Sequence, residues 1–153
     1  MQSESSIRRA AAELDEALEA RDLDRVIACF TPDCTVELLG VRLDGHEGVR
    51  RWLDWVFSHV ERIEFSPRAI SIDGDTFIEE FGVTGRLSNG RRLQSDWAEA
   101  LTYRDALVSS LRLYFNPIDF APALGAIGRA VGPAVVRLAR RGLEPFEPVR
   151  HSR

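Results

Sequence analysis

The chain has 153 residues, enough for one domain with a full hydrophobic core. Its composition, 44% hydrophobic and 29% charged, is that of an ordinary globular protein. All 20 basic residues are arginine, which excludes a Schiff-base lysine and the lysine of Walker-type phosphate loops.

Charge is unevenly distributed along the chain. Residues 1–120 carry 14 arginines against 22 acidic residues, a net charge of −8, whereas residues 121–153 carry +4. The acidic body argues against nucleic acid as a partner. Cys29 and Cys34 are too close in sequence for a disulfide framework, and with no signal peptide we expect a cytoplasmic protein. Three residues interrupt the apolar run 121–139, so we expect no membrane span.

Helices are predicted in the first part of the chain. An apolar stripe predicts a helix over 4–21, capped by Ser5 or Ser6. A short second helix through 26–30 is capped by Asp22 or Asp24 and is stopped before Pro32. A short strand over 34–39 and a loop through the glycines at 40 and 45 follow. A third helix then runs from 49 to about 62.

The second part of the chain predicts strands. A strand over 64–72 precedes one over 76–87, and Asn89-Gly90 is the strongest short hairpin signal in the sequence. Two alternating segments within 88–120, separated by a break at 104–105, complete a three-strand antiparallel meander. Helices followed by a curved antiparallel sheet predict an α+β fold in which the helices close one face of the sheet.

Glu99 lies in the middle strand of this meander among apolar neighbours, where a carboxylate is costly unless it has a task. Alternation places Trp97 on the same face, as pocket wall or dimer surface. For Glu99 itself two interpretations are open. In an apolar cavity its pKa would rise and it could exchange protons near neutral pH. On the convex face it would instead pair with an arginine such as Arg112.

Residues 121–153 form a basic extension with too much apolar surface for a disordered tail. We expect a helix from about Pro133 to Arg141 that packs on the acidic body, as a lid over the pocket or a clasp on a second subunit. An independent appendage is the alternative.

Four short motifs, in this order and spacing, resemble the SnoaL-like branch of the NTF2-like superfamily: ALEARDLD at 17–24, FTPD at 30–33, LDGHEG at 43–48 and LYFN at 113–116. The branch includes polyketide cyclases, ketosteroid isomerases and limonene-epoxide hydrolases. The resemblance covers about residues 6–120 and assigns a domain to residues 1–120. It implies an NTF2-like cone, in which a curved antiparallel sheet wraps around N-terminal helices and encloses an apolar pocket, and it implies a dimer.

The resemblance carries over only part of each catalytic set. Glu99 stands where ketosteroid isomerases have a protonated Asp, a carboxylic acid that is kept neutral at pH 7. The isomerase site also contains a Tyr and a general-base Asp, and Leu14 and Leu38 stand at these two positions here. In limonene-epoxide hydrolases an Asp-Arg-Asp set activates water, and the matching positions here hold Gly82, Glu80 and Asn116.

We therefore predict a cofactor-independent enzyme of the cyclase or isomerase type, which transfers protons on an apolar polyketide-like or polycyclic small molecule. Glu99 is the candidate catalytic acid or base, and Tyr114 and Asn116 are the candidate orienting groups. The expected substrate-binding residues are Trp97, Glu80, Leu14, Leu38, Phe30 and Trp55.

We expect no cofactor, and the three histidines show no metal-ligand spacing. Apolar residues such as Phe77 and Phe81 on long strands predict a homodimer through the convex sheet face. A non-catalytic ligand-binding or dimerisation domain is the competing prediction.

Overall fold

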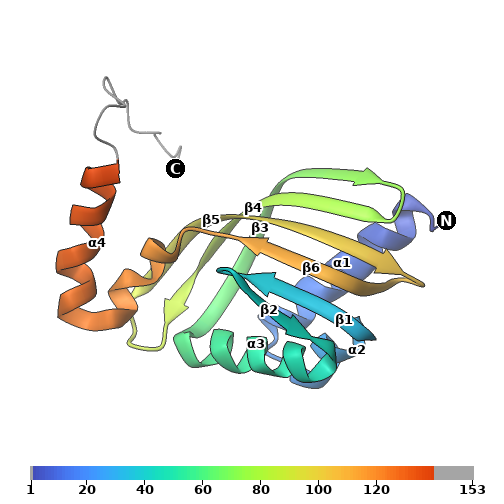
Figure 1. Cartoon of the computed structure of the whole chain (residues 1–153), viewed down its shortest axis with the longest axis horizontal. Coiled ribbons are helices and arrows are strands. Elements are labelled where there is room, and N and C mark those ends of the chain that lie inside the picture. Colours follow the sequence, from blue (N-terminus) through green and yellow to red (C-terminus); the bar gives the residue numbers. More distant parts are fainter. Residues whose placement is uncertain (1, 140–153) are drawn as a thin grey trace.

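The computed structural model describes residues 2–139, and Figure 1 shows a curved sheet with helices packed against one of its faces. Helices α1 (Glu4–Glu19), α2 (Leu23–Ala28) and α3 (Gly45–His59) lie on this concave side. Ser3, rather than Ser5 or Ser6, caps α1 by accepting a hydrogen bond from the Ser6 amide at 3.2 Å. Asp22 caps α2, as expected, by accepting from the Arg25 amide at 3.1 Å.

Six strands form one sheet in the order β2-β1-β6-β5-β4-β3. They are β1 (Phe30–Leu38), β2 (Val41–Asp44), β3 (Val60–Asp73), β4 (Thr76–Leu87), β5 (Arg92–Arg104) and β6 (Leu107–Tyr114). The predicted meander is present as β4, β5 and β6, with antiparallel pairing throughout. Gly90, in the turn between β4 and β5, has φ +82°, which a residue with a side chain rarely adopts.

The sheet is mixed rather than wholly antiparallel, because β1 pairs with β6 in parallel. The segment expected to be a loop contains β2, which pairs antiparallel with β1 at the edge of the sheet. A hairpin joins these two strands, and a short edge strand of this kind carries little alternating apolar pattern for sequence reasoning to detect. The α+β class and the curved sheet closed on one side by helices are confirmed.

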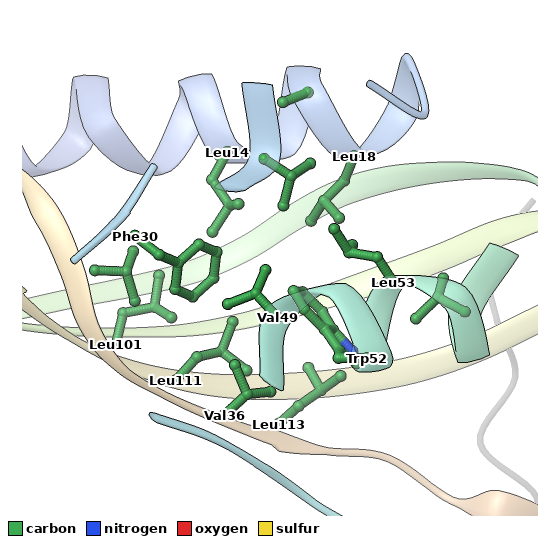
Figure 2. Close-up of a cluster of buried hydrophobic side chains, with 14 of the residues drawn as sticks. Leu14, Leu18, Phe30, Val36, Val49, Trp52, Leu53, Leu101, Leu111 and Leu113 are labelled. Carbon is green, nitrogen blue, oxygen red and sulfur yellow. The ribbon is translucent and has the colours of Figure 1, made fainter. Parts of the chain in front are cut away.

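The core lies between the helices and the concave face of the sheet. Figure 2 shows Leu14 and Leu18 of α1 pointing towards Phe30 of β1 and Leu53 of α3. These side chains follow helical spacing in α1 and α3 and alternate along the strands, so one face of each element is apolar. Burial of this common face holds α1 and α3 on the sheet.

The chain after β6 forms a 3-10 helix, η1 (Pro117–Leu124), and then α4 (Gly125–Ala139). Helix α4 begins eight residues before the expected start at Pro133, and Arg141 lies outside the described residues. Its main packing partner is η1, and in Figure 1 α4 stands beside the sheet. Gly132 permits this close packing, since a Cβ there would lie 3.2 Å from the Cβ of Ala121. Within residues 2–139, no helix has the length and apolar character needed to cross a bilayer.

Candidate active site

A small, partly open cavity lies between α1, α3 and the concave face of the sheet. Asp15 of α1, Trp52 of α3, Phe81 of β4, and Trp97 and Glu99 of β5 are among the residues that line it. Its volume is about 20 Å³, which is about the space that one water molecule needs. The cavity therefore combines aromatic walls with two carboxyl groups in a small, water-poor space.

Glu99 reaches this cavity because β5 alternates regularly. Trp97, Glu99, Leu101 and Tyr103 are all buried and point to the helix side of the sheet. The Glu99 side chain is 8% exposed, and burial is the main cause that raises its pKa to about 8. The negative charges of Asp15 and Glu79 raise this pKa further. At neutral pH Glu99 is thus mainly a protonated carboxylic acid.

Three acidic residues form one cluster on the concave side: Asp15, Glu79 and Glu99. Glu79 of β4 is directly opposite Glu99 in the strand register and is also buried. Asp15 is half-buried, and burial, followed by the charges of Glu79 and Glu19, raises its pKa to about 7. Burial also raises the pKa of Glu79. Within residues 2–139, no basic side chain forms an ion pair with any of the three.

Tyr103 borders the same cluster. Burial, and next the charge of Glu99, raise the pKa of its phenol far above the ordinary range, so the hydroxyl stays protonated. This hydroxyl is buried and has no hydrogen-bond partner among the described residues.

Of the predicted substrate-binding residues, Trp97 alone lines the cavity, and the others lie in the core or nearer the surface. Trp97 lines the cavity and is 5% exposed, which places it in the pocket wall rather than on a dimer surface. Leu14 and Phe30 are fully packed in the core (Figure 2). Leu38 is buried at the end of β1, where it borders open surface grooves. Trp55 lies farther out on α3, against Phe115.

The structure does not bring Tyr114, Asn116 or Glu80 to Glu99. Tyr114 is 57% exposed and lines an open groove on the other side of β6. Asn116 is exposed and caps η1, where its Oδ1 accepts from the Ile118 amide at 3.1 Å. Glu80 is exposed because β4 turns Glu79, not Glu80, to the concave side.

The reason lies in strand parity. In β6 the buried residue is even-numbered at Val108 but odd-numbered at Leu111 and Leu113. The inward-facing parity changes because the β5–β6 pairing contains an irregularity next to Tyr103. Leu113 is the register partner of Glu99, so its neighbour Tyr114 points away. In β4 the buried phenylalanines at 77 and 81 share their parity with Glu79, and this pattern was visible in the sequence.

Sequence reasoning missed Asp15 and Glu79. Glu79 was detectable from the alternation Phe77, Glu79, Phe81, which is the simple burial pattern of a strand. Asp15 sits at the border of the apolar stripe of α1, beside the buried Leu14. No sequence signal links Asp15 to Glu99, which is 84 positions away, and only the packing of α1 on the sheet brings them together.

An aromatic wall separates the cavity from a second hollow. The Trp97 ring stacks on Phe115 with centroids 5.0 Å apart, and Phe120 of η1 lies 6.1 Å from Trp97 and 5.4 Å from Phe115. Beyond this wall is an open, mainly apolar groove of about 370 Å³ between α4 and the body, bordered by Trp55 and Phe115. Helix η1 therefore occupies the outer side of the cavity.

Two side-chain contacts hold η1 in this place. Ser95 of β5 donates a hydrogen bond to Asp119, and Asn89 in the β4–β5 turn donates to the Pro122 carbonyl at 2.8 Å. In residues 2–139, no group of three or more His, Cys, Asp or Glu side chains is arranged to hold a metal ion.

Comparison with solved structures identifies similar folds. An NTF2-like protein of unknown function from Burkholderia pseudomallei superposes with a TM-score of 0.71 at 19% identity, covering 79% of this chain and 98% of that one. A candidate SnoaL-like polyketide cyclase from Jannaschia sp. CCS1 gives 0.71 at 16% identity, covering 82% and 97%. An M. tuberculosis epoxide hydrolase of the limonene-epoxide hydrolase type gives 0.66 at 21% identity, covering 88% and 97%.

These identities are low enough that the likeness shows the fold alone. Comparison with curated protein sequences found no significant match. The sequence profile of the SnoaL-like domain, however, matches residues 11–111, which include Asp15, Glu79 and Glu99. The chain therefore belongs to the SnoaL-like domain family.

Proposed function

We propose that the protein is a SnoaL-like enzyme that transfers protons on a small apolar molecule, with Glu99 as its acid. The observation that carries this proposal is the burial of Glu99 in an aromatic-lined cavity, with its pKa raised to about 8. A group with a pKa near the working pH is efficient both in giving up and in taking back a proton.

Asp15 is the natural partner base. Its pKa of about 7 leaves a large fraction ionised at neutral pH, while Glu99 holds its proton. Two carboxyl groups of different pKa in one cavity provide an acid and a base. In an isomerisation Asp15 would remove one proton from the substrate and Glu99 would deliver one to it. Transfer of a proton from Asp15 to Glu99 would then restore the starting state of the enzyme.

The substrate class rests on the cavity walls and on the family. Apolar side chains, five of them aromatic, dominate the lining, which favours an apolar ring system over a charged metabolite. Candidate polyketide cyclases among the proteins of similar fold agree with a polyketide-like or polycyclic molecule. At about 20 Å³ the cavity is too small for such a molecule, so binding requires the aromatic wall or η1 to move.

A non-catalytic domain that binds a small ligand or a second subunit is the alternative. The small cavity favours it, and so does the placement of Tyr114 and Asn116 away from Glu99. The absence of complete ketosteroid-isomerase and epoxide-hydrolase catalytic residue sets also favours the non-catalytic alternative.

Measurement of the Glu99 pKa by carbon-detected NMR tests whether Glu99 can serve as the acid. The proposal expects a value near 8, and the side-chain carboxyl resonance lost in Glu99→Gln provides the assignment. The matched control is Glu80→Gln, which removes an exposed carboxyl from the next strand. A Glu99 pKa near about 4.3, the value of a solvated Glu, would contradict the acid–base proposal.

A further inference from the structure

Three arginines stand in one row across neighbouring strands on the outer face of the sheet. In the strand register, Arg86 of β4 is paired with Arg62 of β3 on one side and with Arg92 of β5 on the other. These strands lie side by side in Figure 1. All three side chains are exposed, and a buried apolar residue follows each of them in sequence, so the row points away from the core. Side chains at directly opposite positions begin about 5 Å apart, and like charges there are destabilising.

A second row on the outer face shows how this sheet accommodates arginine elsewhere. Glu37 of β1 is paired in register with Arg42 of β2 and with Arg112 of β6. The Glu37 carboxylate lies 3.4 Å from Nη1 of Arg42 and 3.3 Å from Nε of Arg112. Charges therefore alternate along this row. The row on β3, β4 and β5 instead has an arginine at its centre, where the alternating row has an acid.

Acidic neighbours neutralise the arginine row only in part. Glu64 pairs with Arg62, and Oε2 of Glu61 lies 3.4 Å from Nε of Arg86. In the part of the chain that the structure describes, Arg92 forms no ion pair. The row thus keeps an excess of positive charge, although the body of the protein is acidic.

The arginine row borders one surface hollow of about 430 Å³ beside the β4–β5 turn. Gly90 of this turn and Thr84 of β4 also line the hollow, as does Glu64. The Thr84 hydroxyl can donate a hydrogen bond to a ligand. The hollow therefore combines three guanidinium groups, a hydroxyl and an uncompensated positive charge, which is the chemistry of an anion site.

The arrangement favours a phosphate group over a carboxylate. A guanidinium group donates two parallel hydrogen bonds to either anion. A phosphate monoester, however, presents three terminal oxygens and carries up to two negative charges, whereas a carboxylate presents two oxygens and carries one. Three arginines in a row match the larger number of acceptor atoms.

We propose that Arg62, Arg86 and Arg92 bind the phosphate group of a small molecule on the outer face of the sheet. The phosphate supplies the negative charge that Glu37 supplies at the centre of the alternating row. The site lies on the opposite face of the sheet from Glu99, so it does not depend on the proposed proton transfer.

Calorimetric titration of the full chain tests the choice of anion. The probes are inorganic phosphate, phenyl phosphate and malonate, at a pH of 8 where all three carry mainly two negative charges, and at one ionic strength set with sodium chloride. We expect both phosphate compounds to bind at least about tenfold more tightly than malonate. Tighter binding of phenyl phosphate than of inorganic phosphate identifies an ester as the ligand, and equal binding identifies the free ion. Malonate affinity equal to that of inorganic phosphate would contradict the proposal.

Two exposed arginines allow a variant test with a charge-matched control. Arg86→Gln and Arg92→Gln should each weaken the binding of inorganic phosphate about tenfold, since each removes a charged hydrogen-bond donor. Arg42→Gln removes the same charge from the alternating row and should leave this binding unchanged. Equal weakening in Arg42→Gln would show a response to net charge alone and would contradict the proposal.

A further measurement needs no variant. Addition of inorganic phosphate should shift the backbone amide resonances of Gly90 and Arg92 in a saturable way. The amide resonance of Gly74, in the turn between β3 and β4, should stay in place, because this turn lies at the other end of β4. No saturable shift at Gly90, or an equal shift at Gly74, would overturn the proposal.

Discussion

Glu79 and Glu99 face each other directly across β4 and β5, both buried on the concave side of the sheet. Like charges at directly opposite positions of an antiparallel pair are destabilising. Since Asp15 adds a third carboxyl and no described basic side chain pairs with the cluster, the three groups cannot all ionise at low cost. The cluster thus holds protons at neutral pH, and this property has measurable consequences.

The first consequence concerns stability and pH. A carboxyl whose pKa is higher in the folded than in the unfolded chain binds its proton more tightly when folded. Glu99 therefore favours folding most when protonated, and stability should fall as pH rises from about 4.3, its unfolded value, through about 8. We expect Glu99→Gln to raise the free energy of unfolding by about 1–3 kcal/mol at pH 8 and to flatten this pH dependence. Urea denaturation at pH 5, 7 and 8.5 measures the free energy of unfolding of both proteins, with Glu80→Gln as the control variant.

The second consequence concerns coupling between α1 and the sheet. The charge of Asp15 contributes to the raised pKa of Glu99, so Asp15→Asn should lower the Glu99 pKa. Carboxyl NMR titration measures the shift. Asp54→Asn is the control, because Asp54 is an exposed carboxyl on α3. An unchanged Glu99 pKa in Asp15→Asn would show that burial alone sets it, and Asp15 would lose its proposed role as partner base.

The third prediction concerns η1 as the cover of the cavity. The sequence led us to expect a helical lid over about Pro133–Arg141, whereas Phe120 of η1 is the residue that packs on Trp97 and Phe115. Deletion of residues after Phe120 should lower the melting temperature and raise proteolysis of the body, because it removes the Asn89 contact to Pro122. Asn89→Ala tests that contact alone. An unchanged melting temperature and unchanged ligand binding in the truncated chain would make the tail an independent appendage.

The fourth prediction concerns assembly. Phe77, Phe81 and Trp97 point into the fold, so they do not supply the outer apolar patch on which the predicted dimer relied. On the outer face of the sheet, Ile78 remains 51% exposed. We still expect a homodimer at micromolar concentration, because contiguous exposed apolar patches, such as the one along α4, are normally covered by a partner. Light scattering of the intact chain measures its mass, and a monomer would contradict the prediction.

Two variants locate the contact. Val131 of α4 is as exposed as Ile78, at 51%, and belongs to a stripe with Ile127, Val135 and Leu138. If the sheet forms the interface, Ile78→Asp should lower the fraction of dimer and Val131→Asp should leave that fraction unchanged. The reverse result would assign the contact to α4.

Local periodicity determined much of this protein. The limits of β4 and the Asn89-Gly90 turn follow from the sequence, since alternation and turn chemistry act between residues close in the chain. The inward direction of Glu99 follows too, because β5 alternates without interruption around it. The motif order indicated the family.

Tertiary structure decided the rest. The irregularity in the β5–β6 pairing changes which parity of β6 faces inward, and it turns Tyr114 away from Glu99. The parallel pairing of β1 with β6 joins segments more than 70 residues apart, which no local pattern specifies. The meeting of Asp15 with Glu99 depends on how α1 packs across the sheet. Burial and mutual repulsion, which give these carboxyls their raised pKa values, exist only once that packing has formed.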